Sequence, residues 1–150
     1  ESAGVLKGLN VQHFRHFQHF QNLQLPSQFL PMSDTPRTYS PDEIAAKLSE
    51  LGLTEWYMEH GWLRRKFNTD GWQSTLMAVN TIGYLCEAAW HHADLSVTWG
   101  KLWVKLNTHD AGGITDKDIE LARKIEDTVL WRPSGGALTG TPNKFVFAKK

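Results

Sequence analysis

Hydrophobic and polar positions follow regular patterns from about residue 41 to residue 133. Apolar side chains recur at helical spacing in three stretches and alternate with polar ones in two pairs of shorter runs. At the start of the first stretch, Ser40 can cap a helix, Pro41 suits its first position and Glu43 can close a capping box. A first helix is therefore expected from residue 41 to about Leu51.

The second and third patterns predict a hairpin followed by a long helix. Aromatic and alternating residues at 56–58 and 62–67 flank a short glycine-containing turn. Asp70 then offers a helix cap, Gln73 occupies the capping-box position, and apolar residues follow at helical spacing as far as Trp90. Apolar residues lie on most sides of this helix, so we expect it to be the buried central helix.

A second strand pair and a last helix complete the pattern. Side chains in 95–98 and 102–107, on either side of a glycine, alternate between the two faces of a predicted strand pair. Thr115 then begins a stretch with helical spacing, which Pro133 ends. A short edge strand is expected within 144–150. The order helix, two strands, helix, two strands, helix predicts an α+β fold (αββαββα): a four-stranded antiparallel sheet with three helices packed on one face.

The segments outside this pattern are assigned to a leader and linker at 1–39 and a tail at 134–150, leaving one domain at 40–133. The leader contains a His-Phe tract at 13–20. Histidines three apart can line one side of a helix and bind metal. The alternative is a leader that is poorly ordered or foreign to the natural chain, and Met32 reads as a natural start that favours this second interpretation.

Composition narrows the function classes. Sixteen basic and sixteen acidic residues cancel, so the general electrostatic attraction that drives nucleic-acid binding is missing and no nucleic-acid partner is expected. Cys86 is the one cysteine, which excludes a disulfide within the chain and favours a reducing cytoplasm. No apolar run approaches the roughly 18 residues that cross a bilayer, so no membrane association is expected.

Three histidines are the candidates for chemistry. His91 and His92 follow the long helix, and His109 follows the last strand of the second hairpin. Imidazoles exchange protons near neutral pH, so several in one pocket suit general acid–base catalysis. A zinc site is also conceivable, but adjacent residues at a helix end usually point in different directions, and no metal site is expected. Alternatively, all three are polar residues at the ends of helices or strands, where backbone groups satisfy their hydrogen bonds.

Several separated motifs resemble those of a known family. Their residues are Glu87-x3-His91-His92-Ala93-Asp94, Leu106-x-Thr108-His109 and Gly113-Ile114-Thr115-x2-Asp118, with the upstream stretch 56–67. They are similar to the signature of the pterin-4a-carbinolamine dehydratases: a Glu separated by three residues from His-His-Pro, a strand ending in Thr-His, and a Gly-Leu-Thr/Ser-x2-Asp helix start. The resemblance runs from about Leu51 to Trp131.

The resemblance implies the fold predicted above and an enzyme that removes water from a 4a-hydroxytetrahydropterin to give quinonoid dihydropterin. His91 and His109 would move protons at the 4a-hydroxyl, one as acid and one as base, while His92 would orient the ring. No metal or organic cofactor is implied. The groups expected to support the substrate are Glu87, Thr108 and Asp118, with Trp56 as a wall for the ring. Each also has a structural alternative: Asp118 suits a capping box, and Trp56 suits the core.

Three departures from the family pattern point to a particular branch. Ala93 stands where active enzymes usually have proline, Trp99-Gly100 replaces a Tyr-Asn-like pair and puts a bulky ring near the expected pocket, and the tail at 131–142 extends beyond many dehydratases. These features resemble the dehydratase-like Rubisco assembly factors of autotrophs, one of which is associated with α-carboxysomes.

The branch resemblance implies a chaperone that binds Rubisco subunits, acts as a homodimer in the bacterial cytoplasm or carboxysome, and has weak or lost dehydratase activity. The retained histidines favour the alternative, a working dehydratase whose partner is a pterin. A third role within the family is that of a dimerisation cofactor for a transcription factor.

Overall fold

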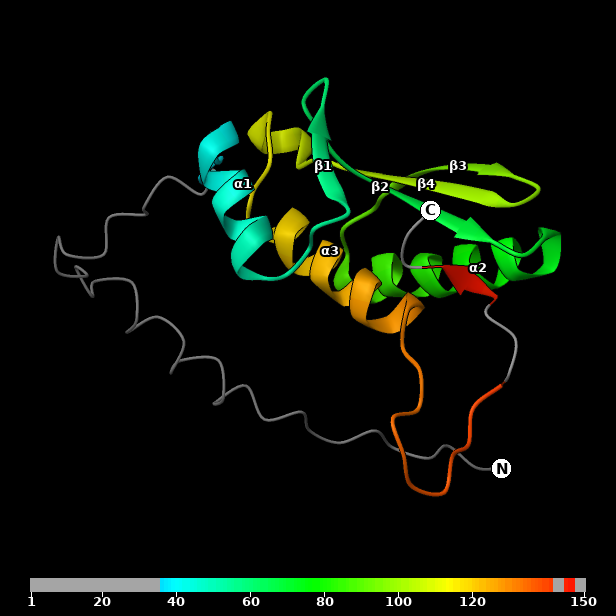
Figure 1. The fold of residues 1–150 in the computed structure, drawn as a ribbon. Helices are drawn as coiled ribbons and strands as arrows, with labels where there is room; N and C mark the ends of the chain where they lie inside the picture. The colour runs from blue at the N-terminus through cyan, green and yellow to red at the C-terminus, as the bar shows by residue number, and fades with distance from the viewer. Residues whose placement is uncertain (1–35, 142–144, 148–150) are drawn as a thin grey trace, which may run out of the picture. The chain divides into compact units, whose positions relative to one another are not determined.

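The computed structural model describes residues 36–141 and 145–147 of the 150-residue chain. The interpretations of the His-Phe tract and of Met32 fall outside these residues. Figure 1 shows the elements, which in chain order are α1 (Pro41–Glu50), β1 (Trp56–Glu59), β2 (Trp62–Thr69), α2 (Trp72–Ala89), β3 (Asp94–Thr98), β4 (Lys101–Leu106), the 3-10 helix η3 (His109–Ala111), α3 (Asp116–Val129) and β5 (Val146–Phe147).

The strands form one antiparallel sheet in the order β1-β2-β4-β3. Both predicted hairpins are present, as β1–β2 and β3–β4. The edge strand predicted near the C-terminus is β5, which pairs with the end of β2 and places Val146 opposite Thr69. The predicted α+β class, with three α-helices and an antiparallel sheet, is therefore confirmed for the described residues, and the edge strand β5 joins the four strands of the two hairpins as a fifth.

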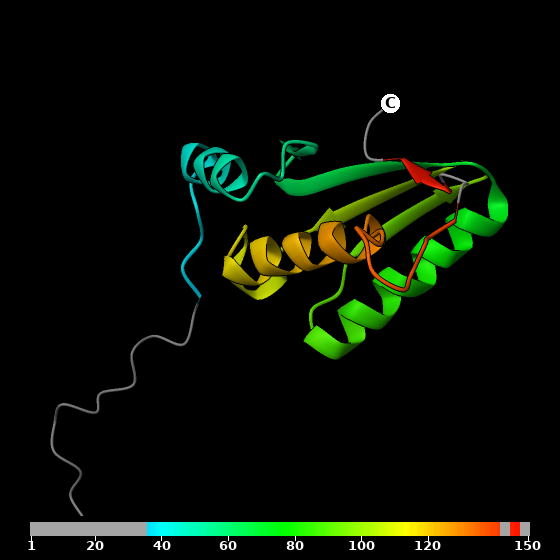
Figure 2. The ribbon, with the colours of Figure 1, turned by 60° about the horizontal axis from the view of Figure 1, so that its bottom comes forward.

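Alternating burial along the central strands explains where the core lies. On β2 and β4 every second side chain is buried, and Leu63 and Phe67 on β2 have no exposed surface. Figure 2 shows α2 and α3 side by side against one face of the sheet. Their buried side chains, such as Ile82 and Ile125, join the sheet's inner residues in one core, to which α1 contributes Ile44 at the β1 end.

The helix starts obey local capping rules at α1 and α3, where the predicted capping boxes of Ser40 and Thr115 are both present. The predicted Asp70–Gln73 box at α2 is wrong. Gly71 is the N-cap there and has no side-chain hydrogen bond, while the Asp70 carboxylate accepts from the Ser74 hydroxyl. Because the Asp70 carboxylate binds a side-chain hydroxyl, it does not accept from the free N–H groups of the first turn, and α2 begins without an Asp70 cap.

The prediction that α2 is buried on most sides is also wrong. Its buried residues follow one side of the helix, whereas Trp72 and Met77 are each 49% exposed and Tyr84 is 73% exposed. The sheet and α3 contact α2 along two directions and leave a third side uncovered. Among the described residues, no helix combines the length and apolarity needed to cross a bilayer.

Trp99 lies far from the place predicted for it. Its indole packs over Gly71, where an added Cβ would lie 3.4 Å from Cζ2 of Trp99. Gly71 is at the N-terminal end of α2 and His91 follows the C-terminal end; the helix has 18 residues, so the two ends are about 27 Å apart at 1.5 Å per residue. The expectation of a bulky ring near the pocket is wrong, because β3 carries the chain back along α2 before Trp99 is reached.

Candidate functional site

The end of α2 directs His91 by a specific hydrogen-bonded turn. Trp90 adopts a left-handed conformation with φ 50°. Its N–H donates to the carbonyl of Glu87 at 3.2 Å, and the N–H of His91 donates to the carbonyl of Cys86 at 3.1 Å. These two bonds form a Schellman motif, which satisfies the last carbonyl groups and reverses the chain. His91 is therefore fixed at its backbone by the helix it follows.

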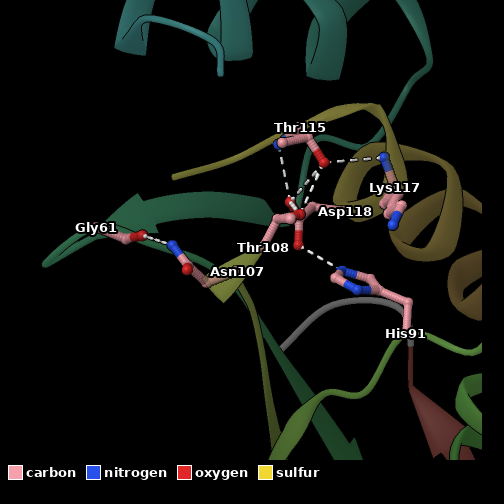
Figure 3. A network of polar contacts seen from close by, with 7 residues as sticks. All are labelled: Gly61, His91, Asn107, Thr108, Thr115, Lys117 and Asp118. Atoms are coloured by element: carbon pink, nitrogen blue, oxygen red, sulfur yellow. Dashed lines mark hydrogen bonds and ion pairs between the residues drawn. The ribbon is translucent and has the colours of Figure 1, made fainter. Parts of the chain in front are cut away.

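A buried carboxylate holds the imidazole of His91. Its Nε2 lies 2.8 Å from Oδ1 of Asp118, at the start of α3. The side chain of Asp118 is fully buried and that of His91 is 12% exposed, and Figure 3 shows the imidazole turned toward the carboxylate. Because an ionised carboxylate only accepts hydrogen bonds, this contact places the proton on Nε2 and leaves Nδ1 of the neutral ring as the acceptor.

The other oxygen of Asp118 is held by two threonines. Its Oδ2 accepts from the hydroxyl of Thr108 at 2.7 Å and from the backbone N–H of Thr115 at 2.8 Å. The two threonine hydroxyls lie 2.7 Å apart. Asp118 is also in the first turn of α3, where the helix dipole favours a negative charge. We name His91, Thr108, Thr115 and Asp118 the His91 network (Figure 3).

His92 belongs to a separate, more exposed pair. Its Nε2 lies 3.1 Å from Oε2 of Glu87, with the two side chains 57% and 70% exposed. The ring of Trp90 meets that of His92 edge to face, with centroids 5.7 Å apart. Adjacent histidines thus enter different environments, as expected for neighbours at a helix end, and Glu87 lies with His92 on the surface.

His109 is attached to the His91 network through the chain. It begins η3 directly after Thr108, whose N–H donates to the carbonyl of Gly113 at 3.0 Å and closes the loop. The imidazole is exposed and makes no hydrogen bond or ion pair with other residues that the structure describes. It is therefore available to a ligand.

Trp56 does not join this group. Its indole is 4% exposed, and Nε1 donates to Oε2 of Glu126 at 2.9 Å. Arg65, 2% exposed, donates to both oxygens of that carboxylate, at 3.0 and 3.1 Å. Trp56 therefore lies in the core, which is the structural alternative that the sequence offered to a wall for the ring. The Arg65–Glu126 pair was not anticipated, because the two residues are 61 positions apart in the chain.

A cavity of about 470 Å³ opens beside His91, between the end of α2 and the first turns of α3. Its walls are largely apolar, formed by Leu85 and Leu121 among others, and its charged lining residues are Lys117, Lys124 and Glu120. Lys117 was not among the residues predicted for the site. The sequence feature that could have identified it is its position next to Asp118 in the first turn of α3. A proton-exchanging ring beside an apolar-walled pocket is an arrangement suited to acid–base chemistry on a flat organic molecule.

Metal and thiol chemistry have no counterpart in the described site. Among the residues that the structure describes, no three His, Cys, Asp or Glu side chains lie where they could hold a metal ion. Cys86 is buried one turn before His91, and burial raises the pKa of its thiol, opposed by the backbone N–H of Ala93. A thiol with a raised pKa is a poor nucleophile at neutral pH.

Comparison with known proteins identifies a family that this chain matches. The family model described as Pterin 4 alpha carbinolamine dehydratase matches residues 37–128. A protein of Aquifex aeolicus named "Putative pterin-4-alpha-carbinolamine dehydratase" is 42% identical over 93 residues, covering 62% of this chain and 92% of the relative. One of the same name from Haloarcula marismortui is 40% identical over 86 residues, covering 57% and 89%.

A solved structure shares the fold. It is described as a transcriptional coactivator/pterin dehydratase from Brucella melitensis, superposes with a TM-score of 0.56 and is 21% identical. The match covers 62% of this chain and 98% of that one.

Proposed function

Because the chain belongs to the pterin 4 alpha carbinolamine dehydratase family, we propose that it removes water from a pterin-4a-carbinolamine by general acid–base catalysis. The observation that carries this proposal is the 2.8 Å contact between Nε2 of His91 and the buried Asp118. It supports a His91 ring with a defined tautomer and an acceptor nitrogen left for a substrate proton.

The reaction needs two proton movements. The C4a–O bond breaks, a proton reaches the departing oxygen and another leaves a ring nitrogen, so the products are water and a quinonoid dihydropterin. His91, with Nδ1 as acceptor, is assigned the base that removes the proton from nitrogen. His109, exposed beside Thr108, is assigned the acid. Neither a metal nor an organic cofactor takes part in this assignment.

The remaining predicted residues have supporting roles in this proposal. Asp118 and Thr108 position His91 and do not touch the pterin. His92 and Glu87 orient the ring from the exposed side of the site. Lys117 faces the cavity beside His91 and is assigned to the polar edge of the pterin, where an ammonium group can donate to carbonyl oxygen.

A dehydration assay on freshly generated carbinolamine tests the proposal. We expect His91→Ala and His109→Ala each to lower kcat by about 100-fold or more, the usual contribution of a positioned acid or base. His60→Asn is the matched control, because His60 is an exposed histidine in the β1–β2 turn at φ 50°, a conformation that asparagine tolerates. A wild-type rate equal to the uncatalysed rate would reject the dehydratase role.

A second candidate function is assistance to Rubisco assembly, in which the chain acts as a homodimer on Rubisco subunits in the cytoplasm or carboxysome. Two features favour it. Ala93 cannot restrict the backbone of His92 as proline would, and Trp99 is 69% exposed at the end of α2 remote from His91. An exposed tryptophan away from a catalytic site is typical of a contact residue for another protein.

Co-expression with Rubisco large and small subunits tests this second role. The chain should raise the yield of soluble holoenzyme, Trp99→Ser should reduce that gain, and His91→Ala should leave it unchanged. An unchanged yield with and without the chain would reject the assembly role. Sedimentation equilibrium would report the homodimer, and a monomer at micromolar concentration would contradict it.

A further inference from the structure

The cavity beside His91 has lining residues to which the proposed chemistry gives no role. Its volume of about 470 Å³ lies in the range of small-molecule sites, roughly 300–1,000 Å³. Leu85, Ala88 and Ala89 of α2 form one wall and α3 forms the other. Figure 2 shows these two helices side by side on one face of the sheet. The cavity therefore continues along α3, away from the reacting end of the site.

Two lysines of α3 mark the length of this cavity. Figure 3 shows Lys117 in the first turn of the helix, next to Asp118, and Lys124 follows seven residues later. Seven residues are almost two full turns, so both lysines lie on the same side of α3, with Cα atoms about 10.5 Å apart along the helix axis. Glu120 and Leu121 line the cavity between them.

The charges of this lining are not neutralised within the described part of the chain. Arg123 and Asp127 of α3 pair with each other, whereas Lys117 and Lys124 form no ion pair with any described residue. Both are exposed, as is Glu120. Lysine is charged at neutral pH, so two cations and one acid leave the lining with one excess positive charge while His91 is neutral.

We propose that the substrate is a pterin whose C6 substituent is anionic, and that Lys124 is the residue that selects it. This inference rests on the proposed function, which places the polar edge of the pterin at Lys117. In a pterin, C6 lies on the pyrazine ring, opposite the pyrimidine ring that carries the amino and oxo groups. A ring held at Lys117 therefore directs its C6 substituent along α3 toward Lys124, whose ammonium favours an anion over a neutral group.

Glu120 gives this selection a second, opposite sign. It lies four residues before Lys124, a spacing at which side chains on a helix are neighbours, and its carboxylate repels an anion in the same cavity. Loss of the Lys124 charge should therefore weaken the preference for an anionic pterin, and loss of the Glu120 charge should strengthen it. A purely structural role of either residue would not produce opposite changes in this preference.

Equilibrium dialysis of the full chain against pterin-6-carboxylate and against the neutral 6-hydroxymethylpterin, at pH 7 and 0.02 M salt, tests the inference. The readout is the ratio of the two dissociation constants. Wild type should bind the carboxylate about threefold to fivefold more tightly, the scale of one ion pair near a surface. Lys124→Gln should bring the ratio to about one, and Glu120→Gln should raise it by at least about twofold. Glutamine is a good helix former, so both exposed positions should stay folded.

Two further variants and a salt series serve as controls. Lys101→Gln makes the same change of charge at an exposed position of β4 and should keep the wild-type ratio. Lys117→Gln should weaken both pterins together, because Lys117 is assigned to the polar edge that they share. At 0.5 M salt the wild-type preference should shrink, because salt screens interactions between exposed charges.

Three outcomes would overturn the inference. They are equal affinity of the wild-type protein for the two pterins, binding of neither pterin, and a ratio that Lys124→Gln leaves unchanged or that Lys101→Gln lowers as much. The dehydration rate judges the proposed function separately. A catalysed rate without a preference rejects only the anionic substrate, whereas a Lys124-dependent preference without catalysis rejects only the dehydratase role.

Discussion

The carboxylate of Asp118 performs two tasks at once: it closes the capping box of α3 and holds the imidazole of His91 at 2.8 Å. One oxygen accepts from the backbone N–H of Thr115, and the other faces the ring. The helix start and the orientation of the candidate base are therefore coupled. A change at Asp118 should alter stability and chemistry together, whereas a change at His91 should alter mainly chemistry.

Asp118→Asn, compared with the loss of charge at another acid of the same helix turn, tests the effects of Asp118 on stability and chemistry. The amide keeps one acceptor but turns its NH₂ toward groups that donate to the native carboxylate, so we expect a loss of about 2–3 kcal/mol in the free energy of unfolding. Urea denaturation measures this loss. The exposed acid two residues earlier supplies the control: Asp116 accepts from the Tyr39 hydroxyl at 2.6 Å, a bond that an amide oxygen can keep, so Asp116→Asn should cost less than about 1 kcal/mol.

The positioning role of Asp118 has a spectroscopic signature. Imidazole ¹⁵N spectra of the wild-type protein should show His91 protonated at Nε2, and Asp118→Asn should remove that preference together with most of the dehydration rate. A variant that keeps the Nε2–H tautomer and full kcat would contradict the role assigned to Asp118, even if its stability fell.

Thr108 provides a test of the second oxygen of Asp118. Its hydroxyl donates to Oδ2 at 2.7 Å in a buried setting, so Thr108→Val should leave an acceptor under-satisfied and cost about 1–3 kcal/mol. Thr108→Ser keeps the hydroxyl and should recover most of this loss. Thermal unfolding of the two variants makes the comparison, and equal melting temperatures would show that the hydrogen bond contributes nothing.

Trp90 occupies a conformation that glycine favours. A left-handed backbone costs a residue with a Cβ roughly 1–2 kcal/mol, and Trp90 is 78% exposed at φ 50°. Trp90→Gly should therefore keep the Schellman turn and raise the free energy of unfolding by up to about 1 kcal/mol. The β-branched Trp90→Val should lower it. If glycine also lowered it, contacts of the indole, such as that with His92, would outweigh the backbone term.

The buried Arg65–Glu126 pair should behave as a unit. Removing one partner leaves a buried charge without its opposite charge, so Arg65→Met and Glu126→Leu should each cost about 3–5 kcal/mol. The double variant should cost clearly less than the sum, because neither charge then remains. Urea denaturation of the four proteins completes the cycle, and additive losses would show that the two side chains act independently.

Burial should protect Cys86 from alkylation. Desolvation raises the pKa of its thiol above the ordinary value of 9.0, so at pH 8 the folded protein holds less thiolate than the unfolded chain and should react far more slowly with iodoacetamide. The same shift makes Cys86 contribute stability below about pH 9 that is lost as pH rises through its folded-state pKa. Alkylation rates with and without denaturant test this, and equal rates would contradict burial of the thiol.

Local patterns in the sequence were sufficient for most of the fold. The capping boxes at Ser40 and Thr115 and the two hairpins depend on residues only a few positions apart, so spacing and residue type predict them. The resemblance also placed His91 and Asp118 in one candidate site. The error at Asp70 arose within the same local rules, because an Asp side chain has a neighbouring hydroxyl as an alternative to the helix N–H groups.

Tertiary packing decided what sequence spacing could not. Asp118 reaches His91 across 27 positions and Arg65 reaches Glu126 across 61, contacts that exist only once α3 lies against α2 and the sheet. Packing also placed Trp99 at the far end of α2 and left one side of that helix uncovered. The sequence by itself therefore determined the helices and strands, because these depend on neighbouring residues. The site and the two faces of the sheet were decided only when the helices packed on the sheet. Contacts between distant residues depend on which surfaces the core has to bury.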